Sequence, residues 1–253
     1  MYFSIKATVG LVLLLLAKIF PYKPKQIFST GNLHILRKQY AKWEFFGVIL
    51  FFILTPSLVY GFGSLFFWMN SFPEKGVDFE FLIIPNLYLW FVPATFLTLA
   101  IIILPMSLIY RLLLRDRYDE YLHYTNLKSG IDGMKIFKLF SWVLGICAIG
   151  SIFLMSDYTI AINDKQIVLN DFFSTDKKAY DFKRIKSISF VENAISKDQK
   201  KISPNPHYYV KFNDGNYWNT TSGLNDEVRQ DKIMQYLAQK SNHKIDTVSY
   251  LTD

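Results

Sequence analysis

One pair of residues in the sequence, Glu120 and His123, has the types and the spacing of a metal site. On a helix, a Glu-x-x-His pair places a carboxylate and an imidazole on the same face, as in di-metal carboxylate proteins. Such sites need a second pair of this kind, and the sequence contains none. We therefore interpret Glu120 and His123 as part of a polar helix at a membrane surface, and we expect no metal and no other cofactor.

A second group that could bind a ligand is a set of basic side chains in the C-terminal part of the chain. The set consists of Lys177, Lys178, Lys183, Arg184 and Lys186. Together they could hold an anionic lipid headgroup or a partner protein. Asp176 and Asp181 lie among them and reduce the positive charge, so an ordinary charged strand face is the alternative interpretation.

The sequence carries no recognisable catalytic motif. It has no nucleophile elbow, no glycine-rich phosphate loop and no zinc-protease helix motif. This favours a non-enzymatic function. A membrane enzyme or transporter component that uses the basic loops is the alternative, but transport and proton relays usually need ionisable residues within the spans, and the long apolar runs contain none.

The elements that must position these residues begin in a membrane. Of the 253 residues, 51% are hydrophobic and only 19% are charged. Uncharged runs cover residues 45–73, 81–110 and 139–156, and about 20 residues suffice for one helix to cross a bilayer core. The sequence therefore predicts an integral, multi-pass membrane protein.

The first 20 residues give the weakest of the apolar signals. Residues 7–17 are uncharged, and Lys6 and Lys18 can reach the interface from a helix about 28 Å long. A secretory signal peptide is the alternative, although no small-residue cleavage site follows the apolar run. Counting residues 1–20 as a span gives an α-helical membrane region of about four transmembrane helices in residues 1–156.

The polar and proline-containing segments divide this region further. Proline distorts helices because it lacks a backbone N–H and its ring crowds the preceding turn. We expect a surface helix within residues 21–42 and a span from Phe45 to about Met69. The run that begins at Phe81 should enter the membrane interface and continue as a kinked helix from about Leu87 to Tyr110, and a final span should cover Leu139–Met155.

Basic side chains gather beside the predicted spans. Residues 1–155 hold 14 Lys and Arg against 8 Asp and Glu, whereas residues 156–253 hold 14 against 13. We assign six basic residues to contacts with membrane lipids at the surface: Arg37, Lys38, Lys42, Arg111, Arg115 and Arg117. No basic face interleaved with aromatic residues occurs outside this region, so the sequence argues against nucleic-acid binding.

The charges of the loops also predict on which side of the membrane each loop lies. Residues 21–42 hold five basic residues and residues 111–138 hold six, whereas residues 70–80 hold one against three acids. By the positive-inside rule the first and third loops face the cytoplasm. Because successive spans cross in opposite directions, the C-terminal part then lies outside the cell (plasma or inner) membrane.

From Asp157 the pattern changes to the period of a strand. Tyr158, Ile160 and Ile162 alternate with polar or small residues, and later segments alternate in the same way up to a helical pattern that ends near Ser241. We expect residues 157–253 to fold as a separate domain that is stable alone, with Trp218 covering its sheet.

Four blocks of this region, in this order, resemble the pleckstrin-homology-like (PH-like) domains that small bacterial proteins attach to membrane helices. The blocks are Tyr158-x-Ile160-x-Ile162-Asn163-Asp164-x-x-Ile167, Tyr180-x-Phe182-x-x-Ile185-x-x-Ile188, Tyr209-Val210-x-Phe212-x-Asp214-Gly215 and the closing helix. The resemblance covers the last two-fifths of the chain. It implies an α+β fold of antiparallel sheets or a barrel with one C-terminal helix, and it implies a cytoplasmic side, against the loop charges.

The same resemblance gives the basic residues between Lys177 and Lys186 a role, since some PH domains hold anionic headgroups on such a strand-loop surface. We therefore expect a non-enzymatic membrane scaffold or sensor that binds a partner protein or a lipid through its C-terminal domain.

Overall fold

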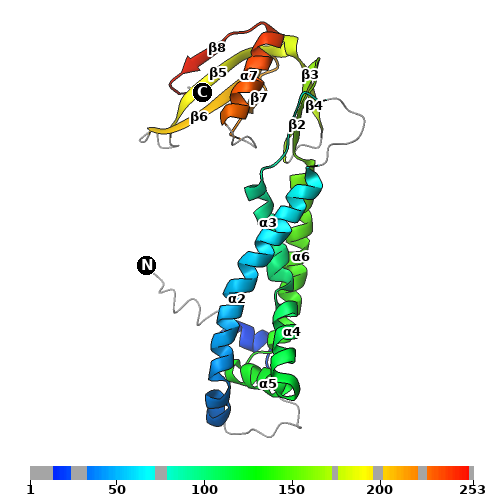
Figure 1. Ribbon diagram of the computed structural model, residues 1–253, viewed down its shortest axis with the longest axis vertical. Coiled ribbons are helices and arrows are strands. Elements are labelled where there is room, and N and C mark those ends of the chain that lie inside the picture. The colour runs from blue at the N-terminus through cyan, green and yellow to red at the C-terminus, as the bar shows by residue number, and fades with distance from the viewer. Residues whose placement is uncertain are drawn as a thin grey trace. The chain divides into compact units, whose positions relative to one another are not determined.

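The computed structural model describes residues 14–23, 33–71, 79–172, 176–195, 202–221 and 227–250 (Figure 1). The chain forms two compact units. Unit 1 contains the described residues up to Phe62 together with Val92–Ile149, and unit 2 contains those of Gly63–Phe91 and those from Gly150 onward. Of the predicted N-terminal helix, only residues 14–20 lie in the described part, and Leu14–Ile19 are helical.

Among the residues that the structure describes, two helices are long and apolar enough to cross a membrane. They are α2 (Leu33–Asn70) and α6 (Gly133–Asp157). A third crossing is available if α3 (Leu87–Ile101) and α4 (Ile103–Leu114) form one span that bends by 41° between them. The chain is therefore a membrane protein, and its described part holds two candidate spans, or three with the bent pair.

The bend lies where the sequence predicts a kink. Pro105 has no backbone N–H to donate to Ile101 four residues earlier, so the helix loses one bond of its ladder at the break. The surface helix expected within residues 21–42 was wrong as a separate element, because residues 33–42 form the first turns of α2. No proline or glycine between Leu33 and Phe46 interrupts the helix there.

A short 3-10 turn, η1 (Arg115–Arg117), joins α4 to α5 (Tyr118–Ser129). Gly130 ends α5 in the left-handed conformation, with φ of 69°, which costs glycine little because it has no Cβ. The backbone N–H of Tyr22 then donates to the Gly130 carbonyl at 3.1 Å, and this bond brings the segment before α2 beside the end of α5.

Unit 2 contains two four-stranded sheets and helix α7 (Glu227–Ser241). The first sheet has the order β1-β2-β3-β4, with all pairs antiparallel: β1 (Phe81–Ile83), β2 (Thr159–Ile162), β3 (Gln166–Asn170) and β4 (Lys178–Asp181). The 3-10 turn η2 (Phe182–Arg184) leads to the second sheet. That sheet has the order β7-β6-β5-β8: β5 (Ile185–Ile195), β6 (Ile202–Phe212), β7 (Tyr217–Asn219) and β8 (Ile245–Val248).

The alternating residues predicted for the C-terminal region form the core of unit 2. Ile160, Ile162 and Val210 are fully buried, and Ile233 and Leu237 from α7 join the same hydrophobic cluster. Trp218 is 3% exposed and belongs to that cluster, as we expected. The period-two pattern thus marks the core face of both sheets.

Strand β1 was not predicted, and it comes from the segment between α2 and α3. The membrane-interface entry expected at the start of the run from Phe81 was wrong, because residues 81–83 pair with β2 instead. Phe81 pairs with Ile162 and Ile83 with Ile160, so these alternate residues face the domain core. Ile83 is 1% exposed. The sheet therefore takes in residues that precede the bent helix pair, well outside residues 157–253.

Two short connections attach the sheet to helices. After β1, residues 84–86 lead to α3, and the Asn86 side chain accepts a hydrogen bond from the Leu89 N–H at 3.2 Å. At the other connection, Asn170 of β3 donates through Nδ2 to the carbonyl of Asp157 at 2.5 Å and to its carboxylate at 3.0 Å. Asp157 is the last residue of α6, so the helix end is bonded directly to the sheet.

The pairing of β1 with β2 also constrains the membrane topology. Two strands in one ladder must lie in the same aqueous compartment. Residues 79–86 and the domain after Asp157 are therefore on one side of any membrane that these helices cross.

Candidate functional site

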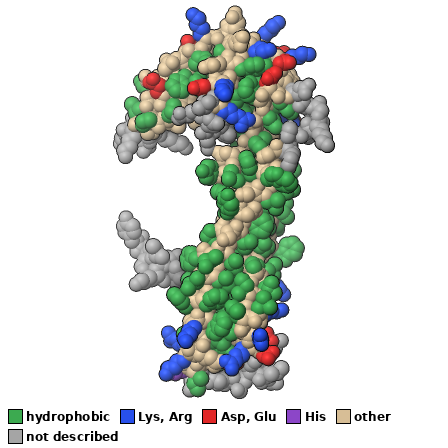
Figure 2. All heavy atoms as spheres, in the orientation of Figure 1, with side chains coloured by type: hydrophobic (Ala, Val, Ile, Leu, Met, Phe, Trp, Pro, Cys, Tyr) green, Lys and Arg blue, Asp and Glu red, His purple; other side chains and the backbone are tan. Residues whose placement is uncertain are grey.

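The five basic residues of the C-terminal region lie where β4 passes through η2 into β5. Phe182 points into the core and is 6% exposed, so its neighbours in η2 face outward. All five basic residues are exposed, and we call them the basic corner: Lys177, Lys178, Lys183, Arg184 and Lys186. On the face of unit 2 seen in Figure 2, basic and acidic side chains are interspersed.

An acid lies beside the basic corner. Lys178 donates through Nζ to the Asn216 side-chain oxygen at 3.2 Å, and Asn216 donates to both carboxylate oxygens of Asp214 at 2.9 and 2.8 Å. Tyr180 donates to the same carboxylate at 3.1 Å. Hydrogen bonding from Asn216 lowers the pKa of Asp214, so this residue stays ionised. The corner therefore presents charges of both signs.

The six basic residues predicted at a membrane surface lie in unit 1, at the end that carries α5. Three are in the first turns of α2, one is in the last turn of α4 and two are in η1. Three further cations of α5 and α6 extend the group. We call the nine exposed residues the basic helix end: Arg37, Lys38, Lys42, Arg111, Arg115, Arg117, Lys128, Lys135 and Lys138. Figure 2 shows basic side chains gathered at this end of the apolar helices.

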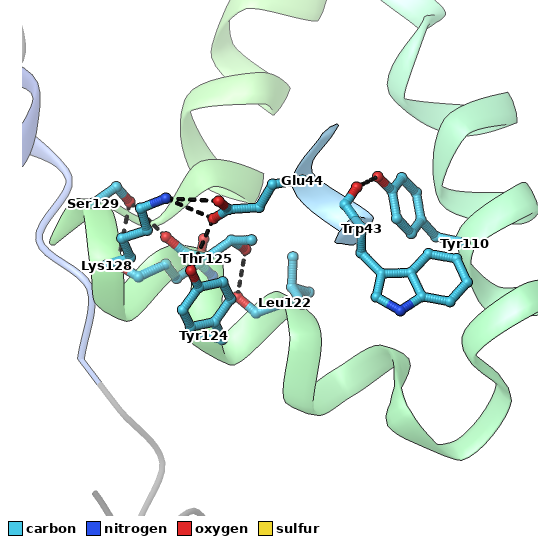
Figure 3. Close-up of polar contacts among 9 residues, drawn as sticks. Trp43, Glu44, Tyr110, Leu122, Tyr124, Thr125, Lys128 and Ser129 are labelled. Carbon is cyan, nitrogen blue, oxygen red and sulfur yellow. Dashed lines mark hydrogen bonds and ion pairs between the residues drawn. The ribbon is translucent and has the colours of Figure 1, made fainter. Parts of the chain in front are cut away.

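A cluster of aromatic residues supports the basic helix end from inside. Tyr40 of α2 is 1% exposed and lies between Tyr121 and Tyr124 of α5, with ring centroids 5.4 and 5.6 Å away. Tyr110 of α4 stacks on Tyr121 at 5.0 Å. The Tyr110 hydroxyl donates to the backbone carbonyl of Trp43 at 2.5 Å (Figure 3). These contacts fasten α2 to α4 and α5.

A glycine, Gly47, allows α2 and α4 to approach each other closely. A Cβ atom at Gly47 would collide with the Tyr110 hydroxyl. The helix can therefore bring its backbone to Tyr110 only because residue 47 has no side chain.

One ion pair adds to this attachment. Lys128 of α5 donates through Nζ to both oxygens of the Glu44 carboxylate, at 2.7 and 2.9 Å, and Tyr124 donates to the same carboxylate at 3.0 Å (Figure 3). The side chains of Lys128 and Glu44 are 43% and 30% exposed. At that exposure an ion pair contributes little stability, typically below about 1 kcal/mol. Its effect is to fix where α5 lies along α2.

The structure places Glu120 and His123 on α5, as the sequence predicts. His123 is 5% exposed, and its Nδ1 shares a hydrogen bond of 2.6 Å with the Tyr22 hydroxyl. Among the described residues, no three His, Cys, Asp or Glu side chains are grouped so that they could hold a metal ion. His123 thus holds the segment before α2 against α5.

Sequence reasoning missed the contacts that attach the domain to its helices. Arg229 of α7 donates through Nη2 to the backbone carbonyl of Leu82 at 2.6 Å, so β1 contacts the C-terminal helix as well as β2. The available signal was the alternation of Phe79, Phe81 and Ile83 after an acidic loop, within an apolar run longer than one span.

The chain was compared with family models, with curated proteins and with solved structures, and none of the three comparisons found a match.

Proposed function

We propose that the protein is a non-enzymatic membrane scaffold or sensor whose C-terminal domain binds a partner protein and is mechanically coupled to the membrane helices. The observation that carries the proposal is the double attachment of the sheet. Strand β1 leads to α3 through three residues, and Asn170 bonds the last residue of α6. A binding module that hung on a flexible tether would have neither contact.

The PH-like fold is part of this proposal. In support, strands β1–β4 form one sheet and β5–β7 belong to a second, and the C-terminal helix α7 follows. Strand β8 is an addition to this order, and it runs parallel to β5 at the edge of the second sheet. The apolar face of α7 covers the core with Ile233, Met234 and Leu237.

A protein suits the basic corner better than an anionic membrane does. Asp176 and Asp181 are exposed beside the five cations, and Asp214 is held in its ionised state. A surface of mixed charge repels an anionic bilayer in part, whereas a protein can match both signs residue by residue.

For the membrane region we propose three crossings in addition to the predicted N-terminal span, of which residues 1–13 lie outside the described part. The three are made by α2, by α3 with α4, and by α6. The support is the pairing of β1 with β2, because residues 79–86 and the domain share one side and the chain between them must cross an even number of times. The loop charges favour the outer side for the domain. With Cys147 changed to Ala, a cysteine at Lys183 should react with a membrane-impermeant maleimide in intact cells, and one at Lys138 should not. The reverse labelling would put the domain in the cytoplasm.

The experiment that tests binding is photo-crosslinking in the native membrane. A benzophenone amino acid at Lys183 of the full-length chain should give one protein adduct of defined mass. The same amino acid at Lys232, which is exposed on α7, is the matched control and should not give that adduct.

Changing Lys178 and Lys186 to Glu should remove the adduct formed at Lys183. Adducts with lipid alone would make a lipid the ligand of the basic corner. Equal adducts at Lys183 and Lys232, or none, would contradict the proposal.

A further inference from the structure

The ends of the membrane helices differ sharply in charge. At one end, residues 33–44 and 111–138 carry the nine cations of the basic helix end against five acids. At the other end, neither α2 nor α6 has a basic residue in its last turn. The cations come from four helices and the turn η1, which are distant in the sequence, so they gather at one end only because the fold brings those segments together.

Three of the cations lie at the depth of lipid phosphates. Lys42 lies three residues before the uncharged part of α2, Arg111 follows the uncharged run of α3 and α4 directly, and Lys138 directly precedes that of α6. One residue of helix advances about 1.5 Å, so each charge stands within a few ångströms of the hydrocarbon boundary.

Most of these cations lie beyond ion-pair distance of the acids in the described part of the chain. Within the described residues, only Lys128 and Lys135 of the nine are within ion-pair distance of an acid, Glu44 and Asp132 respectively. Arg111 lies over the ring of Tyr118 at 5.1 Å, which leaves its charge uncompensated. The basic helix end therefore has seven cations available to external anions.

Aromatic side chains lie at the same depth. Trp43 on α2 is partly exposed next to the start of the uncharged run, and Trp142 on α6 is 75% exposed one turn beyond Lys138. Trp is enriched where a membrane protein meets the headgroup layer, because one end of the ring is apolar and the other polar. A free phosphate or nucleotide would need no such exposed aromatic residues.

From these observations we infer that the basic helix end binds the headgroups of anionic glycerophospholipids, selectively over zwitterionic ones. Lys42, Arg111 and Lys138 contact the phosphates. The cations farther from the hydrocarbon, Arg37 and Lys38 on α2 and Arg115 and Arg117 on η1, contact the anionic headgroups from the aqueous side. The site is separate from the basic corner and does not depend on the proposed partner of the domain.

The test is native mass spectrometry of the full-length protein in detergent, titrated with phosphatidylglycerol or with phosphatidylcholine of the same acyl chains. Phosphatidylglycerol should bind at concentrations at least about tenfold lower, given about 1 kcal/mol for each cation at a membrane surface. The triple variant Lys42→Gln, Arg115→Gln, Lys138→Gln should lose most of that preference.

A matched control changes three exposed lysines of unit 2, Lys165, Lys232 and Lys244, to Gln and should keep the preference. A charge-conserving variant of the three test positions, with Lys and Arg exchanged, should also keep it, which separates loss of charge from loss of folding.

Equal binding of the two lipids by the unmodified protein would overturn the inference. So would an equal loss of preference in the control variant. Displacement of bound phosphatidylglycerol by soluble glycerol phosphate at similar concentration would also overturn it, because the site would then select a free phosphate and not a lipid.

Discussion

Replacing Ile83 by Ala should destabilise the C-terminal domain, although in the sequence Ile83 belongs to the segment that connects the membrane helices α2 and α3. The side chain is 1% exposed and stands opposite Ile160, which is fully buried, in the pairing of β1 with β2. Truncation of a buried Ile to Ala typically costs about 2–5 kcal/mol. Because β1 is an edge strand of three residues, we expect the lower part of that range, about 2–3 kcal/mol.

Hydrogen exchange measures this loss where it occurs. In the full-length protein, amides of β2 and β3 should exchange roughly 30- to 150-fold faster in the Ile83→Ala variant, since about 1.4 kcal/mol corresponds to a factor of ten. Leu82→Ala is the matched control. Leu82 is half-buried and pairs with Ala161 on the other face of the sheet, so the expected cost is below about 1 kcal/mol.

The same reasoning changes our expectation for the isolated fragment 157–253. That fragment lacks β1, so it should be less stable than the same residues joined by a flexible linker to residues 79–86. Exchange at β2 that is the same in unmodified protein and in the Ile83→Ala variant would refute the assignment of β1 to the domain core.

Three further predictions concern single contacts. Gly47→Ala should lower the melting temperature of the protein in detergent, because the Cβ collides with the Tyr110 hydroxyl. Tyr110→Phe removes that hydroxyl together with its hydrogen bond to Trp43, so the loss caused by Gly47→Ala should be much smaller when it is measured against Tyr110→Phe alone. An equal loss in both backgrounds would contradict the contact. Trp218→Ala should cost about 3–5 kcal/mol in chemical denaturation of the domain, since Trp218 is buried, and an unchanged midpoint would mean that the residue is exposed. Burial and the hydrogen bond to Asp231 raise the pKa of Tyr208 to about 12 from its ordinary value of 10. The stability due to the neutral phenol is therefore complete below pH 10 and falls between pH 10 and 12. Tyr208→Phe should flatten this part of the plot of stability against pH, and an unchanged plot would refute the assignment.

The sequence indicates the apolar helices and the domain core for a simple physical reason. Charges are excluded from a bilayer core, so the uncharged runs mark α2 and α6 without any knowledge of their neighbours. Alternation of the type seen at Tyr158, Ile160 and Ile162 likewise depends only on one buried face of a strand. Both signals are local.

The strands that were missed are short or depend on distant partners. β1 has three residues and β8 has four. β8 pairs in parallel with β5, from which β6, β7 and α7 separate it in the sequence. From the sequence alone, the polar, Lys-rich residues 193–206 with Pro204 and Pro206 predict a loop. The structure instead extends β5 to Ile195 and begins β6 at Ile202, with residues 196–201 outside the described part. Proline is tolerated there because β7 pairs only with residues 209–211, so this half of β6 lies at a sheet edge.

The candidate sites were predictable in part. Exposed cations could be named from the sequence, because Lys and Arg beside apolar runs stay in water. The contacts of Glu44 with Lys128 and Tyr124 could not, since they join residues about eighty positions apart. The same holds for the bond between Arg229 and Leu82, which depends on the full fold of unit 2.

The central claim is that the segment between α2 and α3 is a strand of the C-terminal domain, and a disulfide tests it most directly. With Cys147 changed to Ala, cysteines at Leu82 and Ala161, which stand opposite each other, should cross-link under mild oxidation in native membranes. Cleavage at a protease site inserted after Gly130 should then leave the two fragments joined on a non-reducing gel. A pair at Leu82 and Val168, one strand farther away, should not cross-link, since adjacent strands lie about 4.8 Å apart. Failure of the first pair, or equal cross-linking of both pairs, would contradict the account.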